Sequence, residues 1–176
     1  MGPAVKAWLL TVPMVMTVHG QEQFVPEPYR SVAAYSGVPP GILYAMALQE
    51  SGRHMKGEWA PWPWTLNING EPQYYDGRQA MFQALMAAVG AGTTNVDIGP
   101  LQVNWRWQFE LLGSPWQSTD PVYNTKVGSQ ILRRHYLQTG DWWQAVGRYH
   151  RPADDPKHRM VAQAYSDRVK RRWEQL

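Results

Sequence analysis

The sequence of 176 residues contains no cysteine, which excludes disulfide bonds and any metal or cluster site that depends on thiolate ligands. It also lacks the short motifs that hold nucleotides or catalytic zinc, with no CxxC pair, Walker loop, GxGxxG or HExxH. The five histidines are scattered along the chain. We therefore expect no metal ion, no nucleotide and no other cofactor.

Long hydrophobic runs are also missing, because the N-terminal apolar run covers only residues 7–18 and is short for a membrane span. Lys6 precedes this run, and Val18, His19 and Gly20 resemble a cleavage site that follows a signal peptide. We predict a signal peptide over residues 1–20, export to the periplasm, and a mature domain over residues 21–176. The alternative, an uncleaved membrane anchor, is disfavoured by Pro13 and by the length of the run.

No internal repeat, low-complexity tract or linker is visible, and 44% hydrophobic with 18% charged residues is ordinary for one globular domain. Phenylalanine is scarce: three stand against ten tryptophans and nine tyrosines. Rings with a polar edge suit wet surfaces that bind sugars or partners, although many of them also fill cores. The formal net charge of +3 suits a polyanion, which leaves nucleic acid, an anionic membrane and an acidic wall polymer open.

Turn and capping residues divide the chain into a mostly helical pattern with one hairpin. Pro39 and Pro40 start a helix that ends near Gly52, and Asn69 and Gly70 form the turn of a hairpin. The hairpin's second arm contains Pro72, which confines that arm to an edge. The expected helices cover residues 28–36, 40–52, 77–89 with Asp76 as cap, 121–139, a segment capped by Asp141, and a last segment with Val161, Tyr165, Val169 and Trp173 on one face. Lys170, Arg171 and Arg172 in that last segment are expected to form a solvated face, or to contact an anionic wall polymer.

Glu50 lies near the end of the apolar helix over residues 40–52. At about 100° per residue its side chain falls between those of Leu43 and Met46, on the apolar side of that helix. Desolvation and the negative end of the helix dipole both favour the protonated form of such a carboxyl group. Glu50 is therefore a candidate general acid; the alternative is that its side chain bends back to solvent.

Two groups of side chains near Glu50 in sequence suit carbohydrate. The first comprises Trp59, Trp62, Trp64, Tyr74 and Tyr75, which either line a sugar groove or simply stabilise a small sheet. The second lies in residues 95–105, where Gln102 and Asn104 point to the same side if the segment is extended. Their amides can pair with sugar acetamides and hydroxyls.

Four segments in order resemble the soluble lytic transglycosylase family. Residues 49–52 (QESG) resemble its Glu-Ser motif, 98–104 (IGPLQVN) its Gly-Leu-Met-Gln segment, 124–132 (NTKVGSQIL) its Asn-x-x-x-Gly-x-x-x-Leu helix, and 145–150 (AVGRYH) its Ala-rich turn that ends in Tyr-Asn. The match covers roughly residues 28–151. Within the family, the sequence of these segments is most similar to that of transglycosylases of integrating and conjugative elements.

The resemblance implies a mainly helical, lysozyme-like α+β fold with a small inserted hairpin sheet beside an active-site cleft. It also implies cleavage of peptidoglycan between N-acetylmuramic acid and N-acetylglucosamine, with formation of a 1,6-anhydro ring. Glu50 would act as acid and then as base, and Tyr149 would hydrogen-bond and orient it. The residues implied to bind substrate are Ser51, Gln102, Asn104, Asn124 and His150.

The chain departs from the family pattern at three positions, since Pro100 and Leu101 replace Leu and Met and His150 replaces Asn. The implied partners are glycan strands and, through the subgroup, components of a conjugation, type IV secretion or pilus apparatus. Nucleic acid is not among them, and a monomer is expected.

Two other functions remain open. In a muramidase of the goose-lysozyme type, Asp97 or another acid would activate water, whereas the commoner interpretation of Asp97 is a loop-capping residue. A non-catalytic peptidoglycan-binding component of an envelope machine is the third hypothesis, and the presence of Glu50 argues against it.

Overall fold

The computed structural model describes residues 24–176, so the predicted signal peptide lies outside the described residues. The helices are α1 (Glu27–Ser36), α2 (Pro40–Ser51), α3 (Arg78–Gly90), α4 (Trp105–Leu112), α5 (Pro115–Ser118), α6 (Pro121–Thr139), α7 (Trp142–His150) and α8 (Pro156–Trp173). Short antiparallel sheets accompany them, which confirms the predicted mainly helical α+β class. Within residues 24–176 no helix combines the length and the apolar character that a membrane crossing needs.

The strands form two separate sheets. One pairs β1 (Gly52–Met55) with β2 (Glu58–Pro61), and the other has the order β4-β3-β5-β6, built from β4 (Glu71–Tyr74), β3 (Thr65–Ile68), β5 (Val96–Ile98) and β6 (Val103–Asn104). The predicted hairpin is confirmed, because Asn69 and Gly70 join β3 to β4 with φ of 54° and 94°. Pro72 does lie on an edge strand, where a missing N–H leaves no ladder bond unmade.

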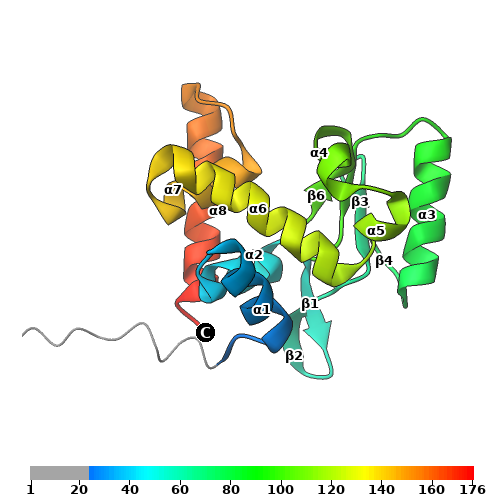
Figure 1. Ribbon diagram of the computed structural model, residues 1–176, viewed down its shortest axis with the longest axis horizontal. Helices are drawn as coiled ribbons and strands as arrows, with labels where there is room; N and C mark the ends of the chain where they lie inside the picture. The colour runs from blue at the N-terminus through cyan, green and yellow to red at the C-terminus, as the bar shows by residue number, and fades with distance from the viewer. Residues whose placement is uncertain (1–23) are drawn as a thin grey trace, which may run out of the picture.

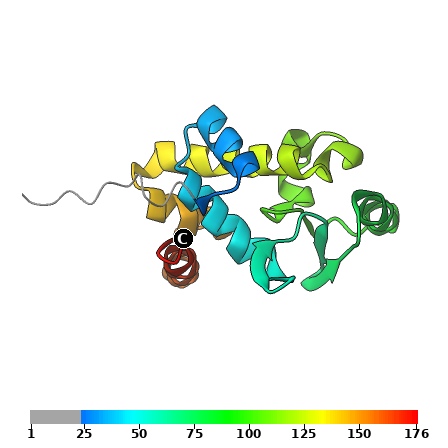
Figure 2. The same ribbon diagram turned by 90° about the horizontal axis from the view of Figure 1, so that it is seen from below.

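Helix α2 lies at the centre of the helical part of the molecule, between α1, α8 and the β1–β2 hairpin (Figure 2). Its apolar residues are buried on nearly every side, so it behaves as a core helix. Gly41 permits this packing, since a Cβ there would lie 2.8 Å from the indole nitrogen of Trp173 at the end of α8.

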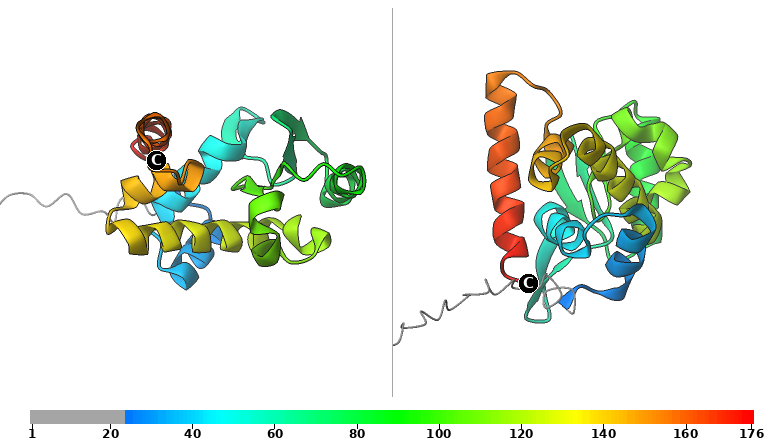
Figure 3. Two further views of the ribbon diagram at one scale, coloured as in Figure 1. Left: turned by 90° about the horizontal axis from the view of Figure 1, so that it is seen from above. Right: turned by 60° about the vertical axis from the view of Figure 1, so that its left-hand side comes forward.

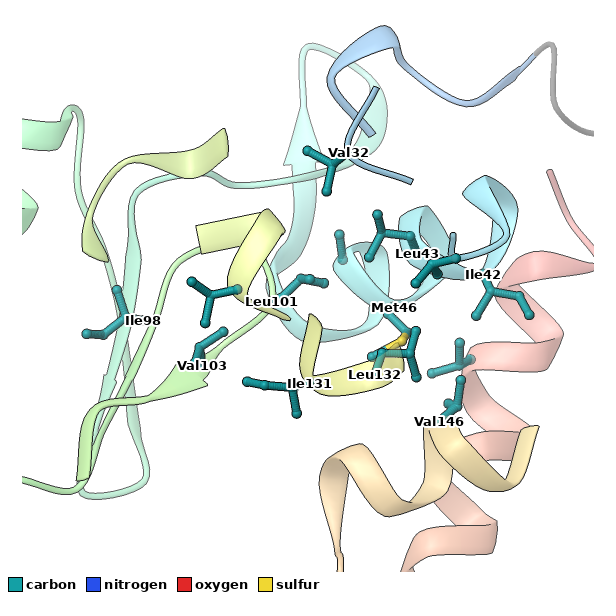
Figure 4. Close-up of a cluster of buried hydrophobic side chains, with 14 of the residues drawn as sticks. Val32, Ile42, Leu43, Met46, Ile98, Leu101, Val103, Ile131, Leu132 and Val146 are labelled. Carbon is teal, nitrogen blue, oxygen red and sulfur yellow. The ribbon is translucent and has the colours of Figure 1, made fainter. Parts of the chain in front are cut away.

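The long helix α6 joins the two parts of the molecule, with α1, α2, α7 and α8 near one end and the β3–β6 sheet with α3, α4 and α5 near the other (Figures 1 and 3). One hydrophobic cluster runs through both parts (Figure 4). Leu43 and Met46 come from α2, Leu132 from α6, and Ile98 and Val103 from the sheet. The sheet and the helix that carries Glu50 therefore share one core.

One capping prediction is wrong. Asp76 does not cap α3, because the extended Gly77 occupies the N-cap position and no side chain caps the helix. Helix α2 does end next to Gly52, which is extended, and a Cβ there would lie 2.2 Å from the Leu48 carbonyl oxygen. In α6, the side chain of Leu101 packs on Gly128.

The sequence patterns also missed the β1–β2 hairpin and the short helices α4 and α5. The first hairpin turns at Lys56 and Gly57, a pair with a weaker turn signal than Asn-Gly. Helix α5 is a single turn, held by a capping box between Ser114 and Gln117.

Candidate functional site

Glu50 lies in the last turn of α2 and is half-buried. The pKa of Glu50 is raised to about 7: burial is the largest cause and the negative charge of Asp97 adds to it, while the hydrogen bond from Tyr165 and the charge of Arg168 act in the opposite direction. The helical wheel anticipated this environment. A carboxyl group with this pKa exchanges its proton readily near neutral pH, as a general acid or base must.

The hydrogen-bond partner of Glu50 is Tyr165, whose hydroxyl donates to Oε1 at 2.5 Å. Tyr165 comes from α8 and is 2% exposed. Burial, the nearby Glu50 charge and this hydrogen bond raise the pKa of Tyr165 well above its ordinary value, so the hydroxyl remains a donor. The sequence placed Tyr165 on one face of the last helix with Val161, Val169 and Trp173 but gave no sign of this contact.

Tyr149 does not hydrogen-bond to Glu50, which corrects the role implied by the resemblance. Its hydroxyl donates instead to the backbone carbonyl of Leu101 at 2.7 Å. The negative charges of Glu50 and Asp97 nevertheless contribute, after burial, to a pKa of Tyr149 well above 10. Tyr149 thus lies close to both carboxyl groups while its hydroxyl holds the loop that contains Leu101.

His150 stacks on Tyr165, with ring centroids 4.4 Å apart and an interplanar angle of 5°. The guanidinium of Arg168 lies 5.7 Å from the centroid of the same tyrosine ring. Burial lowers the pKa of His150, and the charges of Arg151 and Arg168 lower it further, so the imidazole is neutral at neutral pH. His150 therefore contacts the residue that contacts Glu50.

Asp97 and Asn104 form a pair across strands β5 and β6. Nδ2 of Asn104 donates to Oδ1 of Asp97 at 2.7 Å and to Oδ1 of Asn95 at 3.1 Å. Burial raises the pKa of Asp97, although the bond from Asn104 opposes this effect. Asp97 therefore lies in a strand, and its interpretation as a loop cap is wrong.

Ser51 and Asn124 are buried and hold the loop over residues 98–101. The Ser51 hydroxyl donates to the carbonyl oxygens of Ala47 and Pro100, at 3.0 and 2.9 Å. The Asn124 amide donates to the carbonyl of Ile98 at 2.8 Å. Because both side chains are at most 1% exposed, the substrate contacts predicted for them are replaced by structural roles.

Gln102 is not extended, which overturns the expected alignment with Asn104. Its φ is +46°, and its side-chain amide donates to the carbonyl of Gly99 at 2.9 Å. The residue closes the turn between β5 and β6. Its half-buried side chain still lies on the segment that brings Asp97 and Leu101 to the site.

The aromatic residues after Glu50 brace the two hairpins. The indole nitrogens of Trp59 and Trp62 donate to the carbonyls of Leu48 and Tyr75, at 3.3 and 2.9 Å. The Arg53 guanidinium lies 4.9 Å from the ring centroids of both Trp62 and Tyr74. These contacts support the structural interpretation of the cluster, and Tyr74 remains 46% exposed.

Two pockets in the described residues lie away from Glu50. One, of about 250 Å³, is lined by proline and other residues of α1, β2, α6 and the loops between them; the second lies between α7 and α8. Residues 24–176 contain no cluster of three acidic or histidine side chains that can hold a metal ion. Comparison with protein-family models, curated proteins and solved structures found no match.

Proposed function

We propose that the protein is a peptidoglycan lytic transglycosylase with a lysozyme-like fold. The observation that carries the proposal is Glu50, a half-buried carboxyl group with a pKa of about 7 that accepts a hydrogen bond from Tyr165. This environment suits one group that serves as acid and then as base. The order of the four segments that resemble the family supports the same assignment.

In the proposed reaction, protonated Glu50 donates its proton to the oxygen that bridges N-acetylmuramic acid and N-acetylglucosamine. The bond from that oxygen to C1 breaks, and the 2-acetamido group of the muramyl sugar stabilises the developing cation. The Glu50 carboxylate then takes the proton from the C6 hydroxyl, whose oxygen bonds to C1. The 1,6-anhydro ring closes without water, and Glu50 regains its proton.

Tyr165 would help Glu50 to release its proton in the first half of this cycle, because its hydroxyl stabilises the carboxylate that forms. Burial favours the protonated form needed in the first half. With the predicted signal peptide, the proposed place of action is the periplasm. The proposed role is local opening of the wall for a conjugation or secretion apparatus.

Asp97 supports a second candidate, a muramidase. Its charge raises the pKa of Glu50, so the two carboxyl groups are close enough to interact. A second carboxylate beside the acid is the arrangement that activates water or stabilises the cation in glycoside hydrolases. The hydrogen bond from Asn104 holds this carboxylate in place.

The test is mass spectrometry of soluble products after residues 21–176 digest peptidoglycan sacculi. Muropeptides about 18 Da lighter than hydrolytic products would support the transglycosylase, since no water is added. Glu50→Gln should release none, while Asp97→Asn should retain the anhydro products. Reducing ends that disappear in Asp97→Asn would instead indicate the muramidase, and release by neither wild type nor variants would favour a peptidoglycan-binding protein.

A further inference from the structure

A pocket of about 340 Å³ lies between α7 and α8, away from Glu50. On α8 its wall is formed by Arg159, Ala162, Gln163 and Ser166, which occupy positions i, i+3, i+4 and i+7 on one face of the helix. Tyr165, which contacts Glu50, lies outside this wall. The pocket is therefore a separate feature of the helix that supplies the hydrogen-bond partner of the candidate acid.

The two helices approach closely enough to form a shared wall. A Cβ at Gly147 would lie 2.9 Å from the carbonyl oxygen of Ala162, so the contact requires glycine. The Ser166 hydroxyl donates to the carbonyl of Trp143 at 2.7 Å and ties the helices together. The loop between them, the orange segment beside α7 in Figure 1, contributes Arg151, Ala153 and Asp154 to the lining of the pocket.

Positive charge dominates the lining. The lining contains one carboxylate, that of Asp154, and three arginines, Arg148, Arg151 and Arg159, so its formal charge is +2. Arg148 pairs with this carboxylate at 2.7 Å, while Arg159 donates to the backbone carbonyl of Asp154. Among residues 24–176, Arg151 makes no ion pair. Guanidinium groups bind carboxylate and phosphate through two parallel hydrogen bonds, so the donors of this lining match such an anion.

The rest of the lining is neutral. Trp143, Gly147, Ala153 and Ala162 supply apolar surface, and Gln144 and Gln163 supply amide groups. The volume falls in the range of about 300–1,000 Å³ that is typical of small-molecule sites and exceeds what one inorganic anion needs. The geometry therefore fits an anion attached to a small, partly apolar body.

We propose that the α7–α8 pocket binds a small organic anion through Arg151 and its neighbouring arginines. The anionic group is a carboxylate or a phosphate, such as the free C-terminus of a short peptide or a phosphate ester. The proposal does not depend on the proposed function, because Glu50 is not part of the pocket.

Isothermal titration of residues 21–176 with four probes tests the proposal: N-acetyl-dialanine, its C-terminal amide, phenyl phosphate and inorganic phosphate. We expect saturable binding of N-acetyl-dialanine or phenyl phosphate with a Kd of about 1 mM or below, and none of the uncharged amide. Binding of the peptide alone identifies the carboxylate as the source, and binding of phenyl phosphate alone identifies the phosphate ester. Saturation by inorganic phosphate only, or by no probe below about 10 mM, overturns the proposal.

Two variants and one control assign the binding to the pocket. Arg151→Gln should weaken binding about tenfold or more, since it removes hydrogen bonds to a charged group. Arg171→Gln makes the same charge change on α8 outside the pocket and should bind as the wild type does. Ala153→Phe keeps the charge but fills the pocket, and should abolish binding of the organic probes. Equal binding by Arg151→Gln and Arg171→Gln, each shown to be folded by its melting curve, would overturn the assignment.

Discussion

The hydroxyl of Tyr165 donates a hydrogen bond of 2.5 Å to Oε1 of Glu50, although 115 residues separate the two in sequence. The contact joins the central helix α2 to the last helix α8, and these two helices pack against each other. It also lowers the pKa of Glu50 against the larger effect of burial. The proton affinity of the candidate acid therefore depends on how α8 docks.

Replacement of Tyr165 by phenylalanine should raise the pKa of Glu50, because the hydrogen bond that favours the carboxylate is lost. The alkaline limb of the pH–rate profile should move to higher pH, and kcat should fall about ten- to a hundredfold, in line with about 1.5–3 kcal/mol for a hydrogen bond to a charged group. The measurement is the pH dependence of anhydro-product release. Tyr149→Phe is the matched control, since its hydroxyl bonds to Leu101, and its alkaline limb should stay in place. A shift of the limb in Tyr149→Phe alone would contradict the assignment.

Replacement of Glu50 by glutamine should change how stability depends on pH. The folded-state pKa of about 7 lies above the ordinary 4.5, so between these values the folded protein binds more protons than the unfolded chain. Glu50 therefore makes the wild type lose on the order of 3 kcal/mol of stability as the pH rises through this window, and nothing more above it. Denaturant unfolding of both proteins measures the difference, in which the other titrating groups cancel. A constant difference from about pH 4 to pH 8 would show that the pKa of Glu50 is not raised.

Loss of the His150 ring should loosen Tyr165 without removing it. Stacked rings contribute about 0.5–1.5 kcal/mol, so His150→Ala should lower kcat roughly two- to tenfold and leave KM nearly unchanged. His150→Phe keeps a flat ring and should recover most of the loss. A rise in KM with kcat unchanged in both variants would instead support the predicted contact of His150 with substrate.

A methyl group at Gly128 should destabilise the fold, since its Cβ would lie 2.4 Å from Cδ1 of Leu101 and 3.1 Å from the hydroxyl of Tyr149. We expect Gly128→Ala to cost about 1–3 kcal/mol, as overpacked cores do. Gly90→Ala is the control, because Gly90 lies in α3 with nothing within 4 Å of the added atom. That control should be neutral or stabilising by up to about 1 kcal/mol. Equal stability of the two variants would show that the Leu101 loop yields without cost.

The local predictions succeeded where one short segment contains the whole physical reason. Asn69 and Gly70 adopt positive φ readily, so the hairpin followed from the pair itself. Asp141 caps α7 through its own side chain, as its position before the helix indicated. The cap predicted at Asp76 failed because the following Gly77 took the N-cap position.

The candidate site shows the same division between features with a local cause and features that depend on the tertiary structure. Helical periodicity alone placed Glu50 beside Leu43 and Met46, because the angular position of a side chain on a helix follows from the order of residues 40–52. Spacing alone also placed Tyr165 on one face of the last helix with Val161, Val169 and Trp173. Whether the donor to Glu50 is Tyr149 or Tyr165 depended on the distance between helices that are far apart in sequence. Likewise, Ser51, Asn124 and Gln102 turn inward to satisfy buried carbonyl groups of one loop, and those groups exist at that place only after the chain has folded.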